Sequence, residues 1–272
     1  MKRLLSILIV TALILICGSC GRRESDPKDS ETTTTAATTL PPQEPEDPET
    51  SEASASINGV LYRVSADGSY AEVIGYEGDS PHLRIPEEYE GLPVKSISER
   101  AFKNNTTICS ARIPESVTSI GAEAFHGCDR LAVLTIADGV QKIGERAFLG
   151  CTSLHSLTIG GGVREIGEMA FGSCRRLPSI ILPEGLTTIG DYAFYDCTGL
   201  SYVAFPTSVT SIGGYAFYSC WHLTHVYYTG SAEQWEQVNV AYNNACITNA
   251  TLHYNYNTND LYWMPTGRGH RT

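Results

Sequence analysis

The stretch "IGERAFLGC" (143–151) decides the fold, because nearly the same residues return further along the chain. They recur as "IGEMAFGSC" (166–174), "IGDYAFYDC" (189–197) and "IGGYAFYSC" (212–220). An Ala-Phe pair appears six times at intervals of 23 residues, with the phenylalanines at Phe102, Phe125, Phe148, Phe171, Phe194 and Phe217. A fixed period of this size predicts a solenoid, in which each coil buries the faces of its neighbours.

Other apolar columns keep the same period. Ile stands five residues before each Phe, and Gly follows that Ile in every copy except the first, which has Ser98. Two further columns lie nine and eleven residues after the Phe: Ala111, Leu134, Leu157, Ile180, Val203 and Val226, then Ile113, Ile136, Ile159, Leu182, Phe205 and Tyr228. A spacing of two predicts one short strand per coil with these residues inward. The Gly is expected at a corner that a side chain would obstruct.

The combined pattern L-x-x-[IV]-x-[IL]-P-x-x-[VL]-x-x-I-G-x-x-A-F-x-x-C resembles the BspA-type leucine-rich repeat of bacterial surface proteins. The resemblance covers 85–228 and implies a β-rich solenoid of short parallel strands. The flanks resemble the family's caps. Residues 57–84 form the expected N-terminal hairpin cap, since "VLYRVSADGSYAEVIGY" (60–76) alternates around the turn signal Asp67-Gly68. Residues 229–256 form the expected small C-terminal α/β cap, with a helix at 229–238 capped by Ser231 and a closing strand at 247–256.

The N-terminal residues predict export. Lys2 and Arg3 precede an apolar run that is too short to span a bilayer, so residues 1–19 read as a signal peptide. The following "CGSC" (17–20) resembles a bacterial lipobox, which implies that Cys20 is lipidated and holds a secreted protein to the membrane by lipid alone. Cys17 stands where Leu is usual, which leaves cleavage by ordinary signal peptidase as the alternative. Residues 20–56 are rich in Thr, Pro and Glu and are predicted to be a disordered linker. No fold is assigned to the tail, 257–272.

Composition excludes several functions. The net charge is −11, and the acidic residues are spread over linker and body, whereas nucleic-acid binding requires Lys and Arg concentrated on one face. The sequence has no nucleophile elbow, zincin helix, Walker loop or dinucleotide fingerprint. We therefore predict neither an enzyme nor a cofactor.

The recurrent cysteine has four possible roles: metal ligand, disulfide partner, nucleophile or core filling. The column is Asn105, Cys128, Cys151, Cys174, Cys197 and Cys220. Stacked coils lie about 4.8 Å apart, farther than the roughly 3.8 Å between Cβ atoms in a disulfide, and a ladder does not converge on a metal. In leucine-rich repeats Asn and Cys replace each other at this position, so we predict a structural ladder. "CWHLTH" (220–225) is also not expected to bind metal, because Cys220 faces inward and His225 outward.

The surface then carries the function. Outward strand positions are small and polar in the middle repeats and become aromatic toward the C-terminus. We hypothesise that Ile181, Tyr202, His225 and Tyr227 contact a ligand, with packing under the C-terminal cap as the alternative. The predicted function is a non-enzymatic cell-surface adhesion protein whose strand face binds an extracellular protein. The alternatives are a glycan-binding module that uses exposed Tyr and Trp, and a scaffold for an envelope enzyme.

Overall fold

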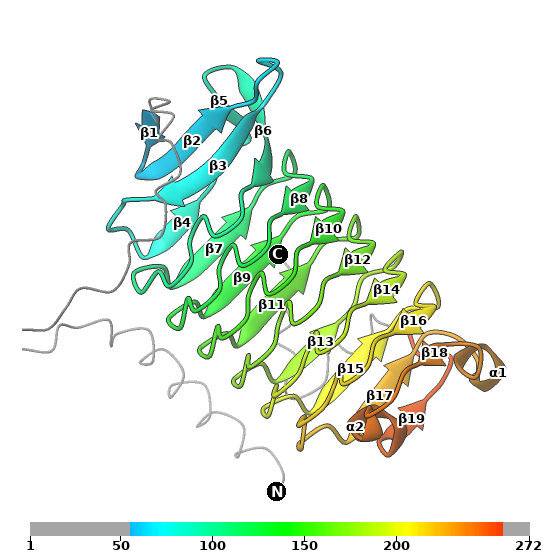
Figure 1. Cartoon of the computed structure of the whole chain (residues 1–272). Coiled ribbons are helices and arrows are strands. Elements are labelled where there is room, and N and C mark those ends of the chain that lie inside the picture. The colour runs from blue at the N-terminus through cyan, green and yellow to red at the C-terminus, as the bar shows by residue number, and fades with distance from the viewer. Residues whose placement is uncertain (1–54, 258–272) are drawn as a thin grey trace, which may run out of the picture. The chain divides into compact units, whose positions relative to one another are not determined.

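The structure is a computed structural model that describes residues 55–257. The predicted signal peptide, Cys20, nearly all of the predicted linker and the tail from 258 onward lie outside the described residues. Within 55–257 no helix has the length and apolarity that crossing a membrane requires. The described chain winds into a solenoid of parallel strands with a small cap at each end (Figure 1), which confirms the predicted fold class.

One side of the solenoid, the strand wall, contains the strand that the sequence predicts in each coil (Figure 1). Its predicted strands are β7 (Ser110–Ile113), β9 (Val133–Ile136), β11 (Ser156–Ile159), β13 (Ser179–Ile181), β15 (Tyr202–Phe205) and β17 (His225–Tyr228). Equivalent residues of paired coils are in register, so Leu134 lies between Ala111 and Leu157. The expected inward residues are buried apart from Leu157, which is partly buried. Alternation therefore predicted the strands and their orientation.

The opposite side, the Ile wall, is also a parallel sheet, which the sequence reasoning missed. It runs through β6 (Leu92–Ile97), β8 (Ser119–Ile120), β10 (Lys142–Ile143), β12 (Glu165–Ile166), β14 (Thr188–Ile189), β16 (Ser211–Ile212) and β18 (Asn239–Val240). Most of these strands have only two residues, too few for an alternating pattern to be visible. Their Ile side chains are nevertheless buried, as the column predicts.

The six phenylalanines form one continuous stack between the two walls. Neighbouring rings have centroids 4.5–5.5 Å apart and are inclined by 5–17°. Each ring is at most 2% exposed. Offset stacked rings at this separation attract one another beyond the effect of their burial. The coils are therefore held together through their centre as well as through their sheets.

Glycine follows the Ile because the backbone of the preceding coil occupies the space of a side chain. A Cβ on Gly144 would lie 2.7 Å from the carbonyl oxygen of Ile120 and 2.7 Å from the carbonyl carbon of Gly121. The first copy follows the N-terminal hairpin, where the backbone N–H of Ser98 donates to the carbonyl of Val73. The segment in front of the first copy is thus the hairpin and not a repeat coil.

The turn around each Phe joins neighbouring coils by hydrogen bonds from alternate residues. In the second repeat the backbone N–H groups of Glu123, Phe125 and Gly127 donate to carbonyls of the next coil at 2.7–2.8 Å. The alternation requires left-handed backbone at Glu123 (φ 54°) and Gly127 (φ 71°). The position two before the Phe is left-handed in all six coils, although none of the six residues is Gly or Asn. The hydrogen bonds between coils offset a cost of roughly 1–2 kcal/mol per residue.

The strand wall divides into two four-stranded sheets between β11 and β13. In other coils the residue before the strand donates its N–H to the coil behind it, as His155 does to Ala132 at 3.0 Å and Ser201 to Pro178 at 2.8 Å. Pro178 has no N–H to donate to the carbonyl of His155. The first bond of the ladder between these two coils is thus chemically impossible.

Each end of the solenoid is capped. The N-terminal cap contains β1 (Ala55–Ile57), β2 (Val60–Val64) and β3 (Ala71–Tyr76), antiparallel as the turn signal predicts, and β5 (Glu88–Tyr89) pairs with β6. The expected cap segment 57–84 also includes β4 (His82–Arg84), which instead pairs in parallel with β7 as the first strand of the strand wall.

The C-terminal cap contains both predicted elements, and each is shorter than predicted: the helix expected at 229–238 covers four residues. Helix α1 (Ala232–Trp235) begins at Ser231, whose hydroxyl accepts from the N–H of Gln234 in a capping box. The closing strand expected at 247–256 is limited to β19 (Thr251–His253), because a helical turn, α2 (Ala245–Thr248), precedes it. β19 pairs in parallel with β17 and so extends the strand wall by one strand.

Candidate binding surfaces

The outward surface of the strand wall, here called the strand face, is a row of aligned side chains. Two residues per strand point outward, and parallel pairing places equivalent residues side by side. The outward residues, from β4 to β19, are His82, Arg84, Ser110, Arg112, Val133, Thr135, Ser156, Thr158, Ser179, Ile181, Tyr202, Ala204, His225, Tyr227, Thr251 and His253. The chemistry of the face changes from basic and hydroxyl-bearing to aromatic where the sheet divides.

The first four strands, β4 to β11, form the polar half of the strand face. Arg84 and Arg112 are register partners and both are exposed. Beside them Nδ1 of His82 lies 2.8 Å from the hydroxyl oxygen of Ser110. Val133 is the large apolar residue of this half, 38% exposed. This half presents cations, hydroxyls and one apolar side chain to solvent.

The last four strands, β13 to β19, hold all four residues of the predicted contact patch. Tyr202 and Tyr227 are each 5% exposed and meet edge to face, with ring centroids 5.7 Å apart. Ile181 and Tyr256 pack against this pair. The two tyrosines therefore pack under the C-terminal cap, which was the alternative to ligand contact. Burial raises the pKa of Tyr227.

His225 differs from the other three because it is exposed. Its Nδ1 lies 3.1 Å from Nε2 of His253, whose ring stacks on Tyr227 with centroids 4.6 Å apart. The sequence reasoning did not single out His253, because it lies in the cap and outside the repeat. Within the predicted patch, His225 is thus exposed to solvent and Ile181 is partly buried.

The cysteine column is a buried ladder in the turn. Its five thiols are at most 1% exposed, and none of the cysteines of residues 55–257 is disulfide-bonded. Each Sγ lies 3.0–3.5 Å from the carbonyl oxygen of a Phe in the preceding coil. In the first coil Oδ1 of Asn105 accepts from the N–H groups of Thr107 and Ile108, both at 2.9 Å. Asn and Cys thus both form hydrogen bonds with the backbone of the turn, Asn by accepting from N–H groups and Cys by donating to a carbonyl.

Burial makes these thiols unreactive. Desolvation raises the pKa of Cys128 to about 12 and that of Cys174 well above its ordinary value. A thiolate nucleophile needs the opposite shift. Among the described residues there is no group of three His, Cys, Asp or Glu side chains able to hold a metal ion. Cys220 is buried, whereas His222 and His225 are exposed.

A second surface, the tyrosine patch, lies beside the stacked phenylalanines on the turns of the last two repeats and the cap. Its members are Tyr192, Tyr195, Tyr215, Tyr218, Trp221 and Tyr242. Tyr218, Trp221 and Tyr242 are 42%, 69% and 66% exposed. None of these six residues is in the contact patch that the sequence predicts. One signal for the patch is that the position two before the Phe is charged in the first three repeats, as in Arg100, and is Tyr in the last two.

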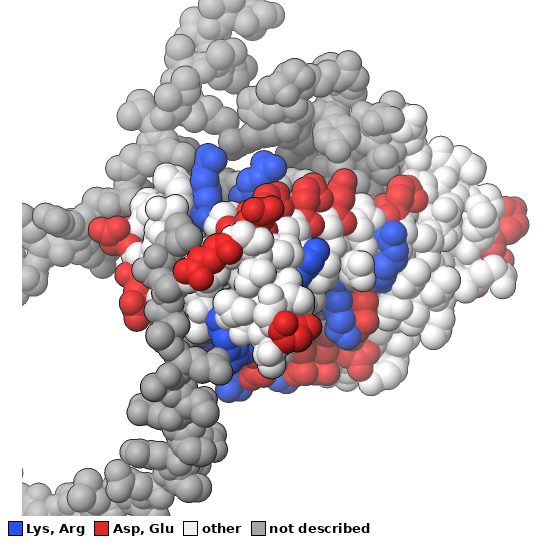
Figure 2. All heavy atoms as spheres, turned by 90° about the horizontal axis from the view of Figure 1, so that it is seen from above, with Lys and Arg blue, Asp and Glu red and all other residues white. Residues whose placement is uncertain are grey.

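Charged side chains gather over the N-terminal repeats on the face that Figure 2 shows, and the C-terminal repeats are mostly uncharged there. Among the charged residues of the N-terminal repeats, Glu123 accepts from Nε of Arg100 at 2.9 Å and from Nζ of Lys103 at 2.6 Å. These bonds lower the pKa of Glu123 to about 2. This part of the turn surface is neutralised by ion pairs between coils.

The repeats match a known family. Residues 95–224 match the model of the BspA type leucine rich repeat region in six copies. They are BspA-type leucine-rich repeats. The fold and the recognised family are thereby confirmed for this part of the chain.

Two solved structures of leucine-rich proteins are similar to this chain. A leucine rich repeat protein of T. pallidum is 27% identical with a TM-score of 0.58, over 62% of this chain and 90% of its own. A leucine rich cell surface protein of Faecalibacterium prausnitzii is 30% identical with a TM-score of 0.52, over 65% of this chain and 55% of its own. The chain therefore spans about half of the second protein. No curated protein matches the sequence.

Proposed function

We propose that this protein is a non-enzymatic binding protein of the cell surface, whose strand face binds an extracellular protein partner. One observation carries the proposal: the inward columns stay apolar from coil to coil, whereas the aligned outward residues change along the sheet from Arg, Ser and Thr to Ile, Tyr and His. Burial constrains the inward positions to apolar residues, and the outward positions have no such role in the core. A surface of this kind is open to specialisation for one ligand.

The location at the cell surface rests on two supports. The F. prausnitzii protein, which is similar over 65% of this chain, is described as a cell surface protein. The N-terminal residues resemble a lipoprotein signal ending at Cys20. We therefore propose that lipidated Cys20 holds the protein to the membrane. Replacing Cys20 with Ala should move the protein from the membrane fraction to the medium, and unchanged membrane retention would contradict the anchor.

The strand-face proposal is tested with a substitution at its centre. Thr158 is exposed on β11, so Thr158→Lys adds a long charged side chain to the face without disturbing the core. Gln141→Lys is the matched control, because Gln141 is exposed beside the Ile wall. The purified protein is assayed against a panel of purified extracellular proteins. We expect Thr158→Lys to weaken capture of the bound partner at least tenfold and Gln141→Lys to leave it intact. Equal capture by both variants would refute a strand-face site.

Glycan binding is the second candidate, favoured by the three exposed rings of the tyrosine patch. Exposed aromatic rings combine a flat apolar face with a polar edge, the chemistry that sugar rings stack on. A glycan array separates the two functions. Binding that Trp221→Ala abolishes and Thr158→Lys spares would assign a glycan to the tyrosine patch, and no glycan signal would leave protein binding as the sole candidate.

A further inference from the structure

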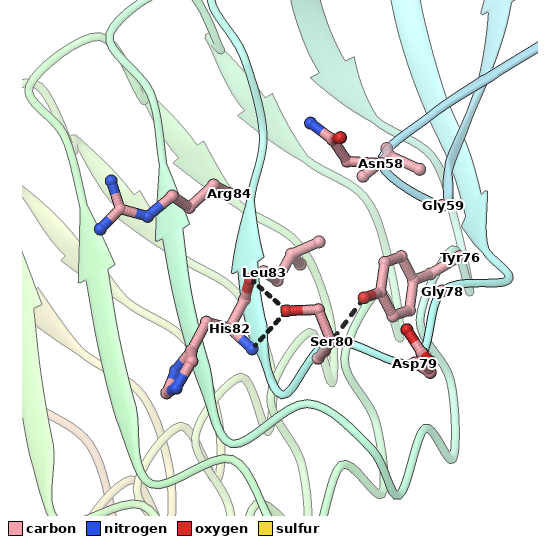
Figure 3. Close-up of a pocket in the computed structure, with 10 residues that line it drawn as sticks. Asn58, Gly59, Tyr76, Gly78, Asp79, Ser80, His82, Leu83 and Arg84 are labelled. Carbon is pink, nitrogen blue, oxygen red and sulfur yellow. Dashed lines mark hydrogen bonds between the residues drawn. The ribbon is translucent and has the colours of Figure 1, made fainter.

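Two arginines lie side by side at the N-terminal end of the strand face, and their side chains have no partner in the described part of the chain. Arg84 of β4 and Arg112 of β7 are register partners in the parallel pair. Among residues 55–257 neither side chain makes a hydrogen bond or an ion pair, and Figure 3 shows the Arg84 side chain extending away from Tyr76 and Ser80. Like charges on adjacent strands repel each other. The pair thus opposes folding slightly, with no contact in return.

The other arginines show that pairing is usual in this protein. Arg63 lies 2.7 Å from a carboxylate oxygen of Glu72, Arg100 lies 2.9 Å from Glu123, and Arg175 lies 2.8 Å from Asp196. Within the described residues Arg176 is exposed and unpaired like Arg84 and Arg112, but it lies in a turn beside the paired Arg175 and not on the strand face. The adjacent, unneutralised pair is therefore a feature of the strand face.

The carboxylates nearest in sequence are occupied elsewhere. Glu87 accepts from the backbone N–H groups of Glu115 at 3.3 Å and Ser116 at 2.8 Å. Glu115 in turn accepts from the N–H of Gly139 at 3.0 Å. No outward position of the strand face, from His82 to His253, is Asp or Glu. In a chain of net charge −11, the protein thus keeps its own acidic groups away from this pair.

We propose that Arg84 and Arg112 bind the carboxylates of an acidic protein segment that lies along the polar half of the strand face. The inference rests on the proposed function and adds the chemistry of the partner. A guanidinium holds a carboxylate through two parallel hydrogen bonds, and two such groups about one strand spacing apart can hold two neighbouring acidic side chains. The hydroxyls of Thr135, Ser156 and Thr158 continue the same surface as further hydrogen-bonding groups.

Charge also explains why the partner should be acidic rather than merely polar. Most of the molecule repels an acidic segment, so a local cationic site both attracts the segment and fixes its position. The adjacent His82 contributes to the polar surface through its contact with Ser110. The strand face therefore selects an acidic stretch at one end only, which sets the direction of the bound segment.

The probe is a fluorescein-labelled oligoglutamate peptide, with oligoglutamine as the uncharged control, and fluorescence anisotropy reports binding. Oligoglutamate should bind the wild-type protein saturably, and more weakly as NaCl rises, because salt screens exposed charges. The double variant Arg84→Gln/Arg112→Gln should bind about tenfold more weakly or worse. Arg176→Gln, which removes one exposed and unpaired charge, is the matched control and should bind like wild type. Removing the like-charge pair should preserve or raise the Tm at low salt, so loss of binding is separable from unfolding.

Equal oligoglutamate binding by the double variant and by Arg176→Gln would overturn the proposal. So would binding of polygalacturonate without binding of oligoglutamate, which would assign the pair to an acidic polysaccharide. The failure of this inference is distinguishable from failure of the proposed function. If Thr158→Lys abolishes capture of the extracellular partner and the double arginine variant does not, the strand face binds protein but this inference is wrong. If Thr158→Lys and Gln141→Lys capture the partner equally, the proposed function itself is wrong.

Discussion

Replacing Phe171 with Ala tests whether neighbouring coils stabilise each other through the phenylalanine stack. Phe171 is fully buried, with ring centroids 5.1 Å from Phe148 and 5.5 Å from Phe194. Its backbone N–H donates to the next coil at 2.8 Å, which prevents the coils from closing around a void. A Phe→Ala change in a rigid core costs about 3–5 kcal/mol. We expect about 4 kcal/mol here, because both faces of the ring lose a stacked partner.

Urea unfolding with linear extrapolation measures the loss. Phe171→Leu keeps most of the volume and should cost less than about 1.5 kcal/mol, which makes it the control. A double-mutant cycle with Phe194 should give a coupling of about 0.5–1.5 kcal/mol, and a cycle with Phe102, three coils away, a coupling near zero. A cost of Phe171→Ala below about 1 kcal/mol, or equal coupling in both cycles, would refute mutual burial through the stack.

Four further predictions concern the turn, the charges, the aromatic cluster and the thiols. Gly144→Ala should destabilise by about 3 kcal/mol in urea unfolding because its Cβ would meet backbone of the preceding coil, while Gly161→Ala, whose Cβ would have 3.8 Å of room, should be neutral. Glu123→Gln should lower the Tm at neutral pH. Since the pKa of Glu123 is lowered from 4.5 to about 2, the difference from wild type should be full above pH 4.5 and vanish as pH falls through 2. Tyr227→Ser should cost about 3 kcal/mol by the same assay, because the ring is buried. In thiol titration of the folded protein, Cys109 and Cys246 should react first and the five ladder thiols only on unfolding.

Each of these predictions has a contradicting result. Equal stability of the two glycine variants would show that the coils yield at the corner. A Glu123→Gln difference that persists at pH 2 would assign its effect to packing. An unchanged Tm of Tyr227→Ser would place that ring in solvent, as a contact residue requires, and rapid labelling of Cys174 in the folded protein would show that the ladder opens.

Periodicity determined the coil, its strand, its core columns and the buried place of the thiols. Each of these features depends on which side chains are buried. The six repeats place apolar residues at the same positions each time, so the buried positions can be identified from the sequence. The strands of the Ile wall were not predicted, because a strand of two residues such as Lys142–Ile143 is too short to show an alternating pattern. The left-handed backbone at Glu123 escaped for a different reason: hydrogen bonds from the next coil impose it on a residue that does not favour it.

The binding surfaces depended on partners that no period reveals. From the sequence, Tyr202 and Tyr227 could equally be exposed or buried. The structure shows that they are buried, because Tyr256, which lies outside the repeats, packs against them. Pro178 is visible in the sequence, but only the structure shows which bond it cannot make. Its missing N–H removes a bond to the backbone carbonyl of His155 in the preceding coil, at the point where the sheet divides. Arg84 and Arg112 become a pair through stacking, since 28 positions separate them along the chain. Composition and period determine what each coil buries, whereas the packing of one coil on the next determines which outward groups meet and which remain unpaired.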